Sequence, residues 1–134
     1  MSIEVSHAQG LLLAQVIPGV TTAVTLFTAS NLRTEITLLV AVIHSGTAGQ
    51  IEIEVYHDDD GTTYGNSTLI ASIQKADNAE GLVFQAQHPG SGILIARGGS
   101  LGVKISTASV VTFSAYGITE TLAERVRGTT AGQM

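Results

Sequence analysis

Hydrophobic and polar residues alternate along most of the chain, and short clusters of Gly, Ser, Asn and Asp separate the alternating segments. In residues 50–56, for example, Ile51, Ile53 and Val55 would all point to one face of an extended strand. The same alternation occurs in residues 82–87, 103–106 and 109–117. A period of two interrupted by frequent turn residues predicts an antiparallel sandwich or barrel.

Other segments are apolar at nearly every position. Residues 36–43 contain Thr37 as their single polar residue and are rich in β-branched types. This pattern predicts a central strand that is covered on both faces. Residues 11–17 and 92–96 are similar, and residues 20–27 and 68–74 bring the expected number of strands to about nine.

Two local motifs predict how the chain turns and ends. The linker Ser45–Gly49 is short and made of small residues, so we expect residues 36–43 and 50–56 to form a hairpin across it. Thr121–Glu124 matches the S/T-x-x-E capping box, which predicts a short C-terminal helical turn ending at Gly128.

The composition is unusually poor in charge. Charged residues make up 13% of the chain, against about 25% in an ordinary soluble domain, and the mean hydropathy is +0.33. The longest apolar stretches, Leu11–Ala14 and Leu38–Ile43, are far shorter than the roughly 20 residues of a membrane-spanning helix. Met1–Val5 has no basic segment, so we expect no signal peptide. We therefore expect a soluble protein that covers part of its surface by forming an oligomer, with no membrane partner.

Charge and cysteine content exclude further classes. Six Lys and Arg against eleven Asp and Glu give a net charge of −5, whereas nucleic-acid binding depends on clustered basic residues. We expect no nucleic-acid partner. The chain has no Cys, which excludes disulfides, thiolate metal sites and cysteine nucleophiles.

Two patterns resemble catalytic motifs, but neither has the context that catalysis requires. Gly98–Gly102 matches G-x-S-x-G around Ser100, yet a strand follows it and the last histidine, His88, precedes it. A β-turn explains this match better. Glu52 and Glu54 lie about 7 Å apart on one strand face, as a glycosidase pair could, but the chain has no Trp and a solvated face is the better interpretation. We expect no enzyme and no catalytic residue.

Metal binding has one weak candidate. The run from His57 to Gly61 contains three consecutive Asp residues, of which Asp58 and Asp60 could contribute to a calcium site. The favoured interpretation is a turn in which Asp side chains accept hydrogen bonds from backbone N–H groups. His44 and His57 end the two strands expected to pair, but a zinc site needs at least one more ligand. We therefore predict no metal and no cofactor.

Several stretches together resemble small virion structural proteins of tailed bacteriophages. They are Val20–Ala29, the strand–turn–strand segment Ile36–Tyr56, the phrase Val55–Tyr64 with its Y-H-D-D-D-G-T-T-Y sequence, and the last two strands Gly99–Lys104 and Val111–Gly117. The resemblance covers residues 18–118. It implies an all-β, jelly-roll-like antiparallel β-sandwich of about eight to nine strands.

The resemblance also implies a role and an organisation. The expected domains are an N-terminal arm with the first strand (1–17), the sandwich (18–118), and a short helix with a flexible tail (119–134). The expected function is that of a capsid decoration (cement) protein, a homotrimer made in the host cytoplasm and bound to the major capsid protein on the outer surface of the phage head. The arms Met1–Gln15 and Glu120–Met134 would make its contacts. The alternative is a receptor- or carbohydrate-binding module of a tail fibre or baseplate, with an exposed aromatic pocket near Tyr56 and Tyr64.

Overall fold

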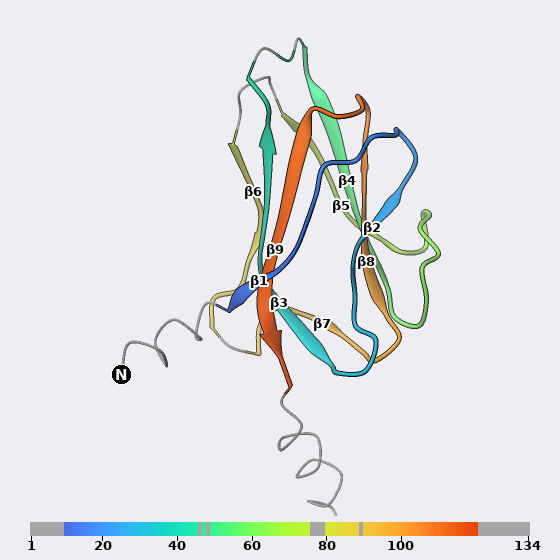
Figure 1. The fold of residues 1–134 in the computed structure, drawn as a ribbon, viewed down its shortest axis with the longest axis vertical. Coiled ribbons are helices and arrows are strands. Elements are labelled where there is room, and N and C mark those ends of the chain that lie inside the picture. Colours follow the sequence, from blue (N-terminus) through green and yellow to red (C-terminus); the bar gives the residue numbers. More distant parts are fainter. Residues whose placement is uncertain (1–9, 46, 48, 76–79, 89, 121–134) are drawn as a thin grey trace, which may run out of the picture.

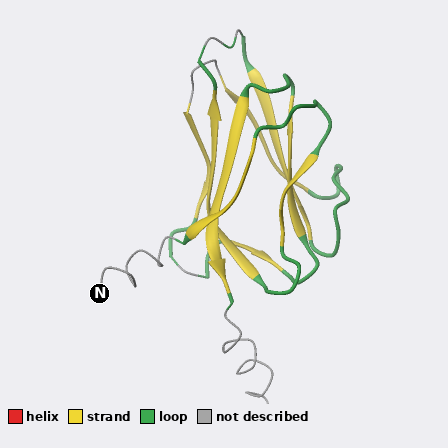
Figure 2. Ribbon diagram, in the orientation of Figure 1, coloured by secondary structure: helices red, strands yellow, loops and turns green. Residues whose placement is uncertain are grey.

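The computed structural model describes residues 10–45, 47, 49–75, 80–88 and 90–120, which form nine strands arranged in two layers (Figures 1 and 2). The strands are β1 (Leu11–Val16), β2 (Val24–Thr28), β3 (Thr34–Ile43), β4 (Ile51–Asp58), β5 (Leu69–Lys75), β6 (Glu80–Gln85), β7 (Ile93–Ile95), β8 (Ser100–Ile105) and β9 (Val111–Thr119). No helix long and apolar enough to cross a membrane occurs in this part of the chain.

All pairing between strands is antiparallel. Sheet A has the strand order β1-β9-β3-β6, and the short β7 pairs with the beginning of β3, beyond the end of β6. Sheet B has the order β2-β8-β4-β5. Figure 1 shows the two sheets face to face. The edge strands β1 and β2 lie next to each other on one side of the sandwich, and the edge strands β5 and β6 lie next to each other on the other side.

One hydrophobic core fills the space between the sheets. Alternate residues of each strand point inward, and the largest fully buried side chain is that of Phe113 in β9. Ile36 and Leu39 of β3 and Ile53 and Val55 of β4 all belong to this one buried cluster. The alternation seen in the sequence is thus the alternation between inward and outward side chains.

The prediction of an all-β antiparallel fold with about nine strands is confirmed, since each expected segment overlaps one observed strand. The predicted hairpin between residues 36–43 and 50–56 is wrong. β3 belongs to sheet A and β4 to sheet B, and residues 44–50 carry the chain from one sheet to the other. This linker is long enough to span the ~10 Å between packed sheets, and the buried Thr47 donates its hydroxyl to the carbonyl of His44 at 2.8 Å within it.

The remaining organisational predictions fall partly outside the described residues. The predicted helical turn and most of both arms lie in residues 1–9 and 121–134, which are not described. Within the described part, the first strand, β1, pairs with β9 from Leu11 to Val16 and is an integral edge of sheet A.

Candidate functional site

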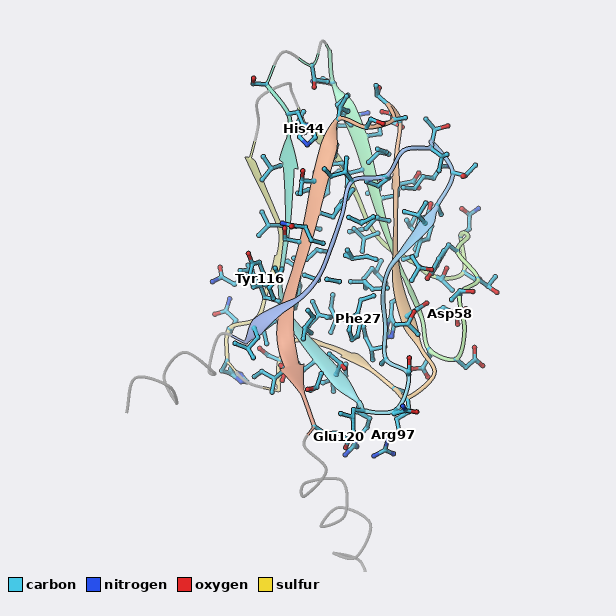
Figure 3. All side chains as sticks on the ribbon, in the orientation of Figure 1. Phe27, His44, Asp58, Arg97, Tyr116 and Glu120 are labelled. Carbon is cyan, nitrogen blue, oxygen red and sulfur yellow. The ribbon has the colours of Figure 1, made fainter. Side chains whose placement is uncertain are left out.

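The outer face of sheet A is a surface over which no other described strand or loop is packed. Paired residues of antiparallel strands lie on the same face of a sheet, so the strand registers define this surface. We call it the sheet A face; on its three strands β1, β3 and β9 it consists of Leu12 and Gln15 of β1, Leu38, Val40 and Val42 of β3, and Thr112, Ser114 and Tyr116 of β9. At its β6 edge the register places Gln85 opposite Leu38 and Glu80 opposite Val42. Figure 3 labels Tyr116 on this side of the molecule.

The sheet A face is apolar or weakly polar. Leu12 is 51% exposed and Val42 is 38% exposed. Among the described side chains of the sheet A strands, Glu35 is the single charged one. Its carboxylate lies at the end of the sheet and accepts the N–H groups of Gly90 and Gly92 at 2.7 and 2.8 Å, so it is already engaged.

The polar groups of the sheet A face also bond to one another. Gln15 donates its side-chain amide to the hydroxyl of Ser114 at 2.9 Å, and His44, next to β3, shares a hydrogen bond of 2.7 Å with Thr112. Sequence analysis predicted that the segment containing β3 is covered on both faces. The inner face of β3 is buried, but no described residue forms a layer over its outer face. Within a single molecule, therefore, β3 is covered on one face only.

The outer face of sheet B has the opposite character. Glu54 and Lys104 are paired in register, with their charged atoms 3.8 Å apart. Glu52 accepts a hydrogen bond from the side-chain amide of Gln74 on the neighbouring strand at 3.1 Å. The two glutamates considered as a glycosidase pair therefore have cross-strand partners on a partly solvated face.

A loop of the same chain, residues 59–68, covers the other end of the sheet B face. Asp58 anchors it: its carboxylate accepts the N–H of Thr63 at 2.6 Å and that of Asp60 at 3.2 Å. These two backbone donors, Thr63 first, lower the pKa of the Asp58 carboxyl below its usual value. The structure thus uses Asp58 as a turn cap, as the favoured interpretation of the Asp run predicted.

Tyr64 holds the loop down on the sheet. Its ring lies 5.9 Å from that of Tyr56, and an added Cβ at Gly102 would come within 2.7 Å of it. The Tyr64 hydroxyl is hydrogen-bonded to Ser100 at 2.7 Å and to Thr25 at 2.9 Å. Because the Ser100 hydroxyl donates to the carbonyl of Gly61, Tyr64 donates to Ser100 and Thr25 donates to Tyr64.

This packing bears on two of the predicted sites. The serine of the G-x-S-x-G match, Ser100, is fully buried at the start of β8 and bonds to Gly61 and Tyr64. Tyr56 is only 5% exposed, and burial first, then the nearby Glu54, raises the pKa of its hydroxyl. Tyr56 therefore offers no exposed ring at the place where the receptor-binding alternative expects an aromatic pocket.

The two strands that end at His44 and His57 do not pair with each other, contrary to the prediction. His44 follows β3 in sheet A and His57 lies in β4 of sheet B, so the two histidines do not end a common hairpin. Within the ranges that the structure describes, no three His, Asp or Glu side chains are grouped as metal ligands.

Sequence reasoning missed an ion-pair cluster at the end of the sandwich where β9 terminates. Glu120 pairs with Arg33 and Arg97, and Figure 3 shows Glu120 and Arg97 close together at this end of the molecule. The backbone N–H of Arg33 and then the two guanidinium groups lower the pKa of the Glu120 carboxyl. Arg33 and Glu120 border a pocket of about 450 Å³ that is also lined by Asp59 and Leu94. The partners are 87 residues apart for Arg33 and Glu120, so no local pattern in the sequence indicates them.

No protein-family model matches this chain, and no curated protein matches it significantly.

Proposed function

We propose that this chain is a structural protein of a tailed-phage virion, a capsid decoration protein that works as a symmetric oligomer, with a homotrimer as the expected form. The sequence resemblance over residues 18–118 suggests the particle, and the observation that carries the oligomer is the bare sheet A face. On β1, β3 and β9 the residues of the sheet A face are leucine, valine, glutamine, threonine, serine and tyrosine, with no charged residue among them.

The arrangement of strands supports this proposal. In a jelly roll, eight strands wrap as two Greek keys, so that strands 1, 8, 3 and 6 form one sheet and strands 2, 7, 4 and 5 form the other. With the short β7 set aside, the observed orders β1-β9-β3-β6 and β2-β8-β4-β5 follow this scheme. We assign the fold as a jelly roll, an architecture used in viral capsid proteins and also in lectins and cupins.

The mechanism is mechanical. A subunit that buries the sheet A face against copies of itself removes exposed leucine and valine from water, which contributes favourable free energy in proportion to the apolar area buried. The resulting oligomer presents the same outward surfaces around its axis and can bind equivalent sites on several capsomers. A protein that binds only the assembled lattice stabilises that lattice by mass action.

The first test is the solution mass of the full chain, measured by light scattering at micromolar concentration. The proposal expects about three times the chain mass of 13.8 kDa; a purely monomeric protein would contradict it. The second test mixes the purified chain with emptied heads of a phage that carries its gene and with host cells. Binding to heads and not to cells supports decoration, whereas binding to cells alone supports the tail-fibre or baseplate alternative.

A further inference from the structure

We propose that the pocket between the outermost strands β5 and β6 binds a small amphiphilic molecule, with an apolar body and one hydrogen-bonding group. The pocket has a volume of about 300 Å³ and is bordered by side chains from both sheets. Its lining residues are Leu39, Val55, His57, Ile70, Ala71, Val83, Phe84 and Ile93. This inference does not depend on the proposed virion role.

The two edge strands depart from regular pairing at this pocket. In β5, Ala71 pairs with Val55 and Leu69 with Tyr56, so Ile70 is an extra residue. In β6, the register against β3 shifts in the same way, and Val83 is the extra residue. Both extra residues line the pocket. Bulges re-aim side chains and are common at sheet edges and beside binding sites, and here one on each sheet borders the same space.

The pocket has an apolar opening. Ile70 is 47% exposed at its border, whereas Leu39 and Val55 are fully buried at its inner side. β5 and β6 are edge strands on the same side of the sandwich (Figure 1). Among the described residues, no further strand pairs with either of them and closes the space between them. A ligand can thus enter between the sheets without breaking a ladder of backbone hydrogen bonds.

One polar atom in this lining has no partner. His57 points inward from β4, and its Nε2 is buried with no hydrogen-bond partner in the part of the chain that is described. Leaving a buried polar group unpaired costs about 1–3 kcal/mol, which a ligand that bonds to it would recover. The other lining side chains are hydrocarbon, so His57 alone gives the pocket polar specificity.

These features define the class of ligand. An apolar cavity of about 150 Å³ accommodates benzene, so twice that volume suits a bicyclic aromatic or a short aliphatic chain. The pocket supplies one imidazole nitrogen, which pairs with a hydroxyl or a carbonyl group. We therefore expect a neutral, compact amphiphile with its polar group placed beside His57.

The test compares two probes of almost the same shape, 1-naphthol and naphthalene, in titrations of the full chain followed by NMR. We expect 1-naphthol to bind at least about tenfold more tightly, since tenfold corresponds to 1.4 kcal/mol, and to shift the ring ¹⁵N resonance of His57. His57→Phe keeps a ring of similar size and should make the two affinities equal. Ala71→Leu fills the pocket and should remove binding of both probes.

Val20→Ala is the matched control, because it shortens an exposed apolar side chain in the connection between β1 and β2, outside the lining of the pocket. It should leave both affinities unchanged. If His57→Phe does not fold, His57→Gln serves the same comparison. The proposal is overturned if the wild-type chain binds neither probe, if it binds both equally, or if Ala71→Leu leaves binding intact. A fall in solution mass for Ala71→Leu, without probe binding to the wild type, would instead assign the pocket to a subunit contact.

Discussion

The two outer faces of this sandwich are both formed by antiparallel strands, but they differ in their charged side chains and in whether a loop covers them. The sheet B face carries Glu52, Glu54 and Lys104, and residues 59–68 fold back over its other end through Tyr64. The sheet A face has neither a charge at its centre nor a covering loop in the described residues. Sheet B is thus complete within one chain, whereas sheet A is left with exposed Leu12 and Val42.

The difference explains the low charge of the whole chain. A single molecule normally covers its surface with charged and polar groups, and contiguous apolar patches mark interaction sites. Among the described side chains, Glu52, Glu54 and Lys104 lie on sheet B, and Glu120 pairs with Arg33 and Arg97 at the end of β9. The apolar face is concentrated on one side, which is the arrangement expected of a subunit rather than of a monomer.

The largest effect is expected from placing a charge on the sheet A face. Leu12→Lys introduces an ammonium group at a position that is 51% exposed in the single chain and pairs in register with the uncharged Tyr116, so the subunit should still fold. Burying that unpaired charge against another copy costs several kcal/mol, and we expect association to weaken by at least about 100-fold. Light scattering over a concentration series measures this change.

The matched control for this variant is Ser72→Lys, which places the same side chain at an exposed position of the sheet B face, opposite Glu54. Its solution mass should equal that of the wild type. If both variants dissociate, or if neither does, the two faces do not differ in the way proposed.

The next largest effect concerns the loop that covers sheet B. In Gly102→Ala the new Cβ would lie 2.7 Å from the ring of Tyr64, so the ring must move and lose its bonds to Ser100 and Thr25. Overpacking of this kind typically costs 1–3 kcal/mol, and we expect a loss of about 2 kcal/mol in the free energy of unfolding. Urea denaturation monitored by tyrosine fluorescence would measure it.

Gly65→Ala is the control within the same loop, because no atom lies within 4 Å of the added Cβ. Its effect should stay below about 0.5 kcal/mol, as for an ordinary surface substitution. Equal losses in the two glycine variants would show that Tyr64 does not fix the loop to the sheet.

Much of this fold could be predicted from the sequence, and the parts that could not have physical reasons. Period-two alternation reports which face of a strand is buried, so segments such as 50–56 were located correctly. Alternation does not report which strand is the neighbour. The linker after Ile43 resembles a hairpin turn, yet it crosses between the sheets, because the neighbours of β3 come from far along the chain, as in the pair Leu39–Ala115.

The candidate sites were less predictable for the same reason. The turn around Asp58 was foreseen because its cap acts over two to five residues. The environment of His57 depends on Val83 and Phe84, and no local pattern brings these residues together. The sequence did indicate an apolar β3, but only the structure shows that its outer residues, such as Val42, are exposed.

A smaller, pH-dependent effect is expected from Asp58→Asn. The N–H groups of Thr63 and Asp60 lower the pKa of Asp58 in the folded chain, so the ionised carboxylate stabilises the folded state. This stabilisation is fully present above the pKa of an unfolded aspartate, about 3.9, and is lost as the pH falls from there through the lower folded-state value. The variant should therefore melt at a lower temperature than the wild type at pH 7, and the difference should narrow below pH ~4.

Thermal unfolding followed by circular dichroism between pH 3 and pH 7 would measure this difference. Asp59→Asn, at an exposed neighbouring position, is the matched control and should melt close to the wild type at pH 7. A difference for Asp58→Asn that stays constant across the whole range would contradict the role of the ionised carboxylate.

The smallest effect is expected at the ion pair of the sheet B face. Glu54 and Lys104 are partly exposed and 3.8 Å apart, and exposed pairs contribute about 0.2–1 kcal/mol. In a double-mutant cycle with Glu54→Gln and Lys104→Gln, we expect a coupling near the lower limit, about 0.3 kcal/mol, that decreases further with added salt. None of these variants should change the solution mass. If removing two charges from sheet B leaves both stability and mass nearly unchanged, while one charge added to sheet A dissociates the oligomer, then the position of charge governs assembly. A coupling above 1 kcal/mol, or dissociation of Lys104→Gln, would place a subunit contact on sheet B instead.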